Sequence, residues 1–273
     1  MNPIRPDWGD VPPNIGAFCT DRTGGISLAP YDDGSGSGQG GMNLGGYAGD
    51  DPAHVEQNRR RLVQMLPAAP LWLRQVHGTD VVDAAHRPVS GESVAADASI
   101  TTAPGVVCAV TTADCLPVLF CDFAGRVVGA AHAGWRGLAA GVLQNTVASM
   151  RAAGAGDIMA WLGPAIGPKN FEVGRDVHSA FTDRDARAEP AFQKSTRAPD
   201  KYFADLYALA RLALQDSGVR RIYGGIHCTV AEPRRFYSYR RDIRTGRMAA
   251  LIWIDTAPVS FYSNQPNGGN DRK

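Results

Sequence analysis

The chain has 273 residues, of which 44% are hydrophobic and 20% charged, as in ordinary globular proteins that bury a large core. Lysine and arginine total 28 against 27 aspartates and glutamates, which leaves a formal net charge of +1. This balance creates no basic field, so we expect neither nucleic acid nor an anionic membrane as a partner.

The N-terminal 20 residues lack the basic start and apolar core of a signal peptide. No apolar run approaches the roughly 20 residues that span a bilayer. The chain contains five cysteines without a CxxC pair, at positions 19, 108, 115, 121 and 228. This odd, scattered set favours free thiols and a reducing compartment, so we expect a cytoplasmic protein.

In chain order, the first half begins with a Gly/Ser-rich stretch at residues 32–41, which predicts a surface loop or lid. A helix is expected over residues 52–66, where apolar residues recur on one face after an acidic cap. Apolar runs then predict strands over residues 71–76, 106–112, 118–121 and 127–131. Pro117 is expected to interrupt the sheet, because proline cannot donate a ladder hydrogen bond.

The second half begins with a predicted helix over residues 137–153, which stops near Gly154. Further strands are expected over residues 158–162, 221–226 and 248–254, and a further helix over residues 203–217. Residues 182–200 read as another surface loop or lid, and residues 263–273 as a frayed tail. The sequence does not divide into two independently patterned halves, so we expect one mixed α/β domain over residues 1–273.

Three short motifs each contain one residue that can bind a metal. Residues 75–78 (QVHG), 113–117 (ADCLP) and 131–137 (AHAGWRG) carry His77, Cys115 and His132. Two imidazoles and a thiolate form a three-ligand zinc set, and catalytic zinc sites typically leave the fourth position open. The combination therefore favours a catalytic zinc site, although the sequence separations of 38 and 17 residues are not diagnostic by themselves.

Each motif has a plainer interpretation. A lone cysteine is usually a small buried hydrophobic residue, which suits Cys108 and Cys121 better than Cys115, because Cys115 lies in a polar turn. Asp114 beside it is expected to orient a metal ligand or to handle a proton. The histidines could equally be ordinary turn residues.

Arginines near glycine-rich turns predict a site for an anion such as phosphate. Arg136 follows the His132 motif, Arg22 precedes two glycines, and Arg240 follows an aromatic strand. Guanidinium groups bind phosphate through paired hydrogen bonds, and Trp135 could stack on a base. Solvated arginines and core aromatic residues are the alternative.

These motifs together resemble the bacterial laccase-domain family of the YfiH type, also labelled multicopper polyphenol oxidase. The resemblance extends over nearly the whole chain and includes residues 20–27, 43–45, 49–52, 58–59, 163–167, 171–174, 205–206, 236–242 and 245–247. It implies a four-layer α/β/β/α sandwich with mixed sheets and a zinc site at His77, Cys115 and His132. It also places Asn43 beside the arginines as a substrate-binding residue. The chain departs from many relatives at Tyr47, which is not counted as a ligand.

The resemblance further implies a purine nucleoside phosphorylase that acts on adenosine, inosine, guanosine and methylthioadenosine, with adenosine deaminase activity. A zinc-activated water would attack C6 of adenine in deamination. In phosphorolysis, the arginines would hold phosphate against the ribose C1′. Purine nucleosides and phosphate are thus the expected partners of a monomer or homodimer.

The oxidase label can be tested with the histidine count. Multicopper oxidases use roughly ten histidines in HxH and HCH pairs, because imidazole is the usual copper ligand. This chain has six histidines and no such pair. Zinc is therefore expected, with copper as an alternative occupant and a copper-dependent polyphenol oxidase as a less favoured function.

Two other functions use the same residues. Cys115 could be the nucleophile of a cysteine hydrolase with His132 or His77 as its base, for example an amidase that edits peptidoglycan. The site could also be a zinc-stabilised binding module without an activity.

Overall fold

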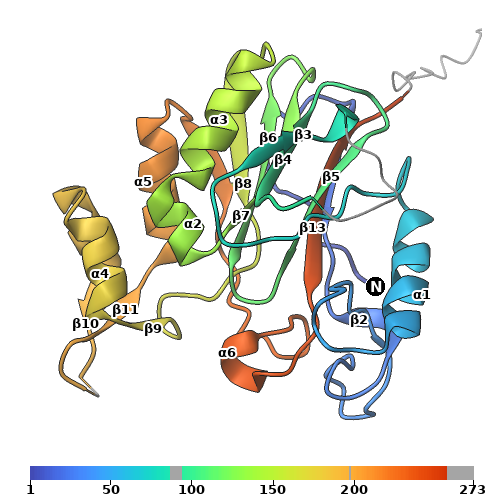
Figure 1. The fold of residues 1–273 in the computed structure, drawn as a ribbon, viewed down its shortest axis with the longest axis horizontal. Coiled ribbons are helices and arrows are strands. Elements are labelled where there is room, and N and C mark those ends of the chain that lie inside the picture. Colours follow the sequence, from blue (N-terminus) through green and yellow to red (C-terminus); the bar gives the residue numbers. More distant parts are fainter. Residues whose placement is uncertain (87–93, 197, 257–273) are drawn as a thin grey trace, which may run out of the picture.

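The computed structural model describes residues 1–86, 94–196 and 198–256 (Figure 1). Its strands form a six-stranded sheet in the order β12-β8-β6-β7-β4-β3 and two three-stranded sheets, β1-β13-β5 and β10-β11-β9. The large sheet is mixed, because β12–β8 and β3–β4 are parallel pairs whereas the inner pairs are antiparallel. The strand bounds are β1 Ile15–Cys19, β2 Thr23–Ser27, β3 Val81–Asp83, β4 Ala98–Thr101, β5 Val107–Thr112, β6 Leu116–Asp122, β7 Val128–Ala133, β8 Ile158–Leu162, β9 Glu172–Gly174, β10 Phe192–Lys194, β11 Lys201–Ala204, β12 Arg221–Gly224 and β13 Met248–Ile254.

The helices surround these sheets (Figure 1). Helices α2 and α3 lie with α5 beside the large sheet, α4 lies with the small sheet β10-β11-β9, and α1 lies on the opposite side of the molecule. The bounds are α1 Pro52–Val63, α2 Trp135–Ala140, α3 Val142–Ala152, α4 Arg175–Thr182, α5 Leu206–Asp216 and α6 Tyr239–Asp242, with 3-10 turns η1 Ala84–His86 and η2 Ala186–Ala191.

Strand β6 shows how the large sheet separates two cores. Successive side chains of a strand point to opposite faces. Val118 and Phe120 pack in the cluster that contains the buried sides of α3 and α5. Leu119 and Cys121 pack instead against β5 and β13 of the second sheet. All seven β6 residues are buried, as expected for a strand covered on both faces.

Strand β13 repeats this arrangement one layer further out. Ala250 and Ile252 face the large sheet, whereas Leu251 and Trp253 pack in a third cluster with Leu62 of α1. The described chain is thus a mixed α/β protein with three sheets, which confirms the expected fold class at that level.

Most of the expected elements are present with shifted ends. Strands β8 and β13 have the expected bounds, and Asp51 caps α1 through the Ala53 N–H. The helix expected over residues 137–153 is two helices, because Gly141 between them has a φ of 106°. The helix expected over residues 203–217 begins only after Asp205, whose carboxylate accepts two N–H groups of α5.

Three expectations were wrong. Residues 71–76 form only isolated bridges, because the backbone enters a turn in which the Val76 N–H donates to the Asp97 side chain. Pro117 does not interrupt the sheet. It is the second residue of β6, so the backbone donor that it lacks is missing only at the end of the ladder. Residues 182–200 include η2 and β10 and are not simply a loop.

The Gly/Ser-rich stretch of residues 32–41 is irregular, as expected, and packs against Arg22 through Asp32. The expected frayed tail lies outside the described residues. No helix in the described ranges is long and apolar enough to span a membrane.

Candidate metal centre and cavity

The three expected ligands come together at one end of the large sheet. His77 lies in a turn before β3, Cys115 lies in the turn between β5 and β6, and His132 lies near the end of β7. Their ligand atoms all lie within 4.8 Å of one another, and they are the one group of this kind among the described residues. His77 is exposed, Cys115 is partly exposed and His132 is buried, so the group is open on one side.

Hydrogen bonds between the Gln75 side chain and the backbone of β5 fix the His77 turn. The Gln75 amide donates to the Thr111 carbonyl at 2.8 Å and accepts the Thr111 N–H at 2.8 Å. His77 has a φ of 59°, an uncommon backbone conformation for a residue other than glycine. The turn is therefore braced against the end of β5, close to Cys115.

A buried carboxylate that the sequence analysis did not single out contacts His132. Asp97, just before β4, accepts a hydrogen bond from His132 Nδ1 at 2.8 Å. A carboxylate can only accept here, so Nδ1 carries the proton and Nε2 is directed elsewhere. Burial opposes ionisation of Asp97, but the hydrogen bonds from His132 and backbone N–H groups outweigh it and lower the pKa of Asp97.

Cys115 and His132 stabilise each other's charged forms. Burial by itself would raise the pKa of Cys115, but the charge of His132 and hydrogen bonds from both imidazoles lower it. Burial would likewise lower the pKa of His132, yet the Cys115 thiolate and Asp97 raise it. A thiolate is the form of cysteine that binds metals and attacks electrophiles.

The ligand spacing fits a tetrahedral zinc ion. Zn–S and Zn–N bonds of about 2.3 and 2.0 Å place neighbouring ligand atoms roughly 3.5 Å apart. His77 Nε2 and Cys115 Sγ are 3.8 Å apart, and the two imidazole rings meet edge to face with centroids 4.9 Å apart. Small adjustments would therefore let these residues hold a metal ion such as zinc.

The ligand group lines a cavity of about 710 Å³. A cavity of this size is in the range of small-molecule sites. Aromatic and polar residues from five parts of the chain surround it, including Tyr47, Trp72, Trp135, Phe171 and Tyr239. Tyr47 and Tyr239 are 77% and 54% exposed, so this part of the lining is in contact with solvent.

Four arginines line this cavity, namely Arg59, Arg136, Arg240 and Arg247. Arg136 packs over the Trp135 ring with its guanidinium carbon 4.4 Å from the centroid. Burial lowers the pKa of Arg247, but an arginine still remains charged near neutral pH. The cavity thus combines a metal-ligand set with positive charge.

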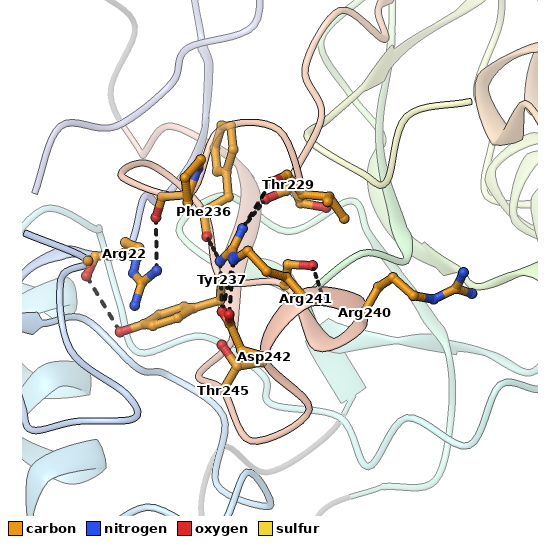
Figure 2. Close-up of polar contacts among 12 residues, drawn as sticks. Arg22, Thr229, Phe236, Tyr237, Arg240, Arg241, Asp242 and Thr245 are labelled. Carbon is orange, nitrogen blue, oxygen red and sulfur yellow. Dashed lines mark hydrogen bonds and ion pairs between the residues drawn. The ribbon is translucent and has the colours of Figure 1, made fainter. Parts of the chain in front are cut away.

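Arg240 reaches the cavity from α6. Its guanidinium donates to the Glu172 carbonyl at 2.9 Å and lies 5.5 Å from the Phe171 ring centroid. Figure 2 shows Arg240 pointing away from the neighbouring Arg241, which is held by Thr229, Phe236 and Asp242. The two consecutive arginines therefore have different surroundings.

Arg22 and Asn43, expected to bind substrate, do not line the cavity. The Arg22 guanidinium donates to Asp32 and to the Pro233 carbonyl, and it lies over the Tyr237 ring (Figure 2). Asn43 is fully buried and accepts the N–H groups of Gly45 and Arg247. These contacts hold loops together.

Asp114 lines the cavity but has partners other than the metal ligands. One carboxylate oxygen accepts the Thr229 hydroxyl, and the other accepts the Arg240 N–H at 2.6 Å. Asp114 therefore fixes the start of α6, which carries Tyr239 and Arg240 into the cavity wall. The carboxylate that contacts a ligand imidazole is Asp97.

The family described as multi-copper polyphenol oxidoreductase laccase matches residues 16–255. The chain belongs to this family. Within it, the chain is 52% identical to "Purine nucleoside phosphorylase YfiH" of Escherichia coli strain K12 over 253 residues, 92% of this chain and 98% of that protein. It is 49% identical to "Purine nucleoside phosphorylase PA4543" of Pseudomonas aeruginosa over 251 residues, 92% of this chain and 98% of that protein.

A solved structure is also similar to this chain. The crystal structure of Neisseria meningitidis protein NMB0706 matches with a TM-score of 0.84 and 48% identity over 93% of this chain and 100% of that chain. The expected family membership is thus confirmed. Sequence reasoning missed Asp97, Arg59 and Arg247 as residues of the site. Asp97 gave no signal, whereas Arg59 and Arg247 lie in segments that the resemblance included.

Proposed function

We propose that this protein is a zinc-dependent purine nucleoside phosphorylase that acts on adenosine, inosine, guanosine and methylthioadenosine and also deaminates adenosine. The observation that carries the proposal is the opening of the His77, Cys115 and His132 group into a cavity lined by four arginines. The curated relatives named above are purine nucleoside phosphorylases at about half identity, which supports the reaction class.

The metal would be held by His77 Nε2, the Cys115 thiolate and His132 Nε2. Bound zinc supplies a Lewis acid with an open coordination position. Asp97 keeps the proton of His132 on Nδ1, and Gln75 braces the His77 turn. Gly134 lies so close to His77 and Cys115 that any side chain there would collide with them.

The arginines would bind phosphate and stabilise its charge. Phosphorolysis develops positive charge at the ribose C1′, and a phosphate held beside it by guanidinium groups is a positioned nucleophile. Arg59, Arg136, Arg240 and Arg247 are the candidates for this role, because they line the cavity with the candidate metal ligands. Trp135, Tyr47 and Tyr239 offer aromatic faces for the purine.

The decisive experiment combines metal analysis with product analysis. Zinc-loaded protein is incubated with each of the four nucleosides, with and without phosphate, and free base and inosine are measured. We expect phosphate-dependent release of base, and loss of both zinc and activity in Cys115→Ala. Base release that does not depend on phosphate would contradict the proposal, and so would full phosphorolysis by Cys115→Ala.

A cysteine hydrolase, such as a peptidoglycan-editing amidase, is the second candidate. The lowered pKa of Cys115 beside His132 favours it, because a thiolate and imidazolium are the nucleophile and acid of such enzymes. Activity that survives chelation and is abolished by alkylation of Cys115 would select this function. Copper in place of zinc is tested in the same metal analysis.

Further proposals concern the molecule as a whole. A four-layer α/β/β/α order is supported by α3 and α1, which pack in clusters on the two outer sheet faces. Five free cysteines support a cytoplasmic location. We propose a single domain that acts as a monomer or homodimer.

A further inference from the structure

We propose that Asp97 is a positioning residue that sets both imidazole ligands at once, the His132 side chain directly and the His77 side chain through its turn. The inference rests on the proposed metal site and concerns how this chain builds it. Asp97 is fully buried, and its side chain lies between the segment that carries His77 and the strand that carries His132.

Asp97 accepts four hydrogen bonds with its two carboxylate oxygens. One oxygen accepts His132 Nδ1 at 2.8 Å and the His77 N–H at 3.0 Å. The other accepts the N–H groups of Val76 at 3.1 Å and Gly78 at 2.7 Å. Three consecutive backbone donors and one imidazole therefore point at a single carboxylate.

This arrangement accounts for the backbone of His77. Three successive N–H groups that converge on an anion form a nest, which requires a residue in a left-handed conformation. His77 has that conformation, with a φ of 59°, which a residue with a Cβ adopts only at a steric cost. The carboxylate of Asp97 is the anion that offsets the cost. If this carboxylate is removed, the turn loses the anion that makes the left-handed backbone of His77 favourable.

The same carboxylate determines which nitrogen of His132 faces the cavity. Because Nδ1–H donates to Asp97, Nε2 is the nitrogen on the side of Cys115 that can offer a lone pair to a metal. The main chain adds to this coupling, since the His132 N–H donates to the Asp97 carbonyl at 2.7 Å. One residue thus couples two ligands from segments about 55 positions apart in the sequence, which the strand pairs β3–β4 and β4–β7 bring together.

Asp122, the last residue of β6, provides a matched comparison for Asp97. It is also fully buried, and one of its carboxylate oxygens accepts the N–H groups of Arg126 at 2.7 Å and Val127 at 2.9 Å. It therefore shapes a turn as Asp97 does, but it contacts no metal ligand. Asp122→Asn reports the cost of disturbing a buried turn, and Asp97→Asn reports that cost plus any effect on the ligands.

The test measures zinc affinity by competition with a chromogenic chelator in the wild type, Asp97→Asn, Asp122→Asn and Cys115→Ala. An asparagine at position 97 must direct an NH2 group either at the backbone donors or at His132. The first choice disrupts the His77 turn, and the second favours a proton on Nε2. We expect Asp97→Asn to weaken zinc binding about 10- to 100-fold, and Asp122→Asn to change it by less than about threefold.

A second measurement needs no variant. Histidine side-chain NMR of zinc-loaded wild-type protein should show a slowly exchanging Nδ1–H of His132, and its absence would overturn the inference even if Asp97→Asn failed to fold. The inference also fails if Asp97→Asn binds zinc like the wild type, or no worse than Asp122→Asn, while Cys115→Ala loses zinc. Zinc affinity retained by Cys115→Ala would instead refute the metal site itself.

Discussion

Gly134 is packed against two of the metal ligands. A Cβ at this position would lie 2.7 Å from His77 Cδ2 and 3.1 Å from Cys115 Sγ. Its backbone, with φ −62° and ψ 155°, is open to any residue, so only the missing side chain requires glycine here. The small residue of the third motif therefore has a steric role next to the ligands.

Gly134→Ala is expected to weaken zinc binding roughly tenfold, because the new methyl group displaces His77 or Cys115 from the metal position. Zinc titration of the purified variant measures the effect. Gly156→Ala is the matched control, since nothing lies within 4 Å of the Cβ that it would add. Equal zinc affinity of the two variants would mean that the ligands move aside freely.

Elements that bury much of their surface were well predicted from sequence, because burial leaves a pattern of apolar residues. The continuous apolar runs of β6 and β13, which are buried on both faces, and the helical repeat of α1 are examples. Elements held by specific side-chain contacts left no such pattern. Residues 75–76 were expected to end a strand, and the shape of the turn that they enter depends on the distant Asp97.

The break between α2 and α3 shows the same limit. Apolar residues continue at helical spacing through both helices, and one residue, Gly141, interrupts them with a φ of 106°. The periodic pattern of apolar residues carries no information about the φ angle of one residue. Glycine adopts this conformation without the steric cost that a Cβ would add.

Gly141→Ala tests this explanation. The nearest atom to an added Cβ is 3.7 Å away, so the expected loss is conformational, about 1–2 kcal/mol of unfolding free energy. Urea unfolding of the variant measures it, with Gly156→Ala as the control for a glycine that lacks a positive φ. A variant more stable than the wild type would show that α2 and α3 can fuse into the continuous helix that the sequence pattern predicts.

For the molecule as a whole, the site depends on long-range assembly. His77, Cys115 and His132 were recognisable as candidate ligands because their motifs are distinctive, and the structure brings them together. The cavity around them was only partly foreseeable. Arg136 and Arg240 line it as expected, whereas Arg22 is used to hold the loop of residues 32–41. Whether an arginine faces a ligand or a neighbouring carbonyl depends on contacts between distant segments, which a single sequence does not reveal.

Because the metal ligands join the turn before β3 to β6 and β7, bound zinc should stabilise the whole fold. A ligand that binds only the folded state at 100 times its dissociation constant adds about 2.7 kcal/mol to the unfolding free energy. At about 2–4 °C per kcal/mol for a chain of this size, stripping zinc with a chelator should lower Tm by roughly 5–10 °C. Differential scanning calorimetry of zinc-loaded and stripped protein measures the shift.

Cys115→Ala separates this linkage from a general effect of the chelator. The variant retains the two imidazoles but lacks the thiolate, so its Tm should stay within about 1 °C when the chelator is added. A wild-type Tm that does not respond to chelator or to added zinc would show that the three ligands meet without forming a metal site. An equal response of wild type and variant would place the stabilising metal elsewhere. A response confined to the wild type would tie the stability of the sheet to the same three side chains that line the cavity.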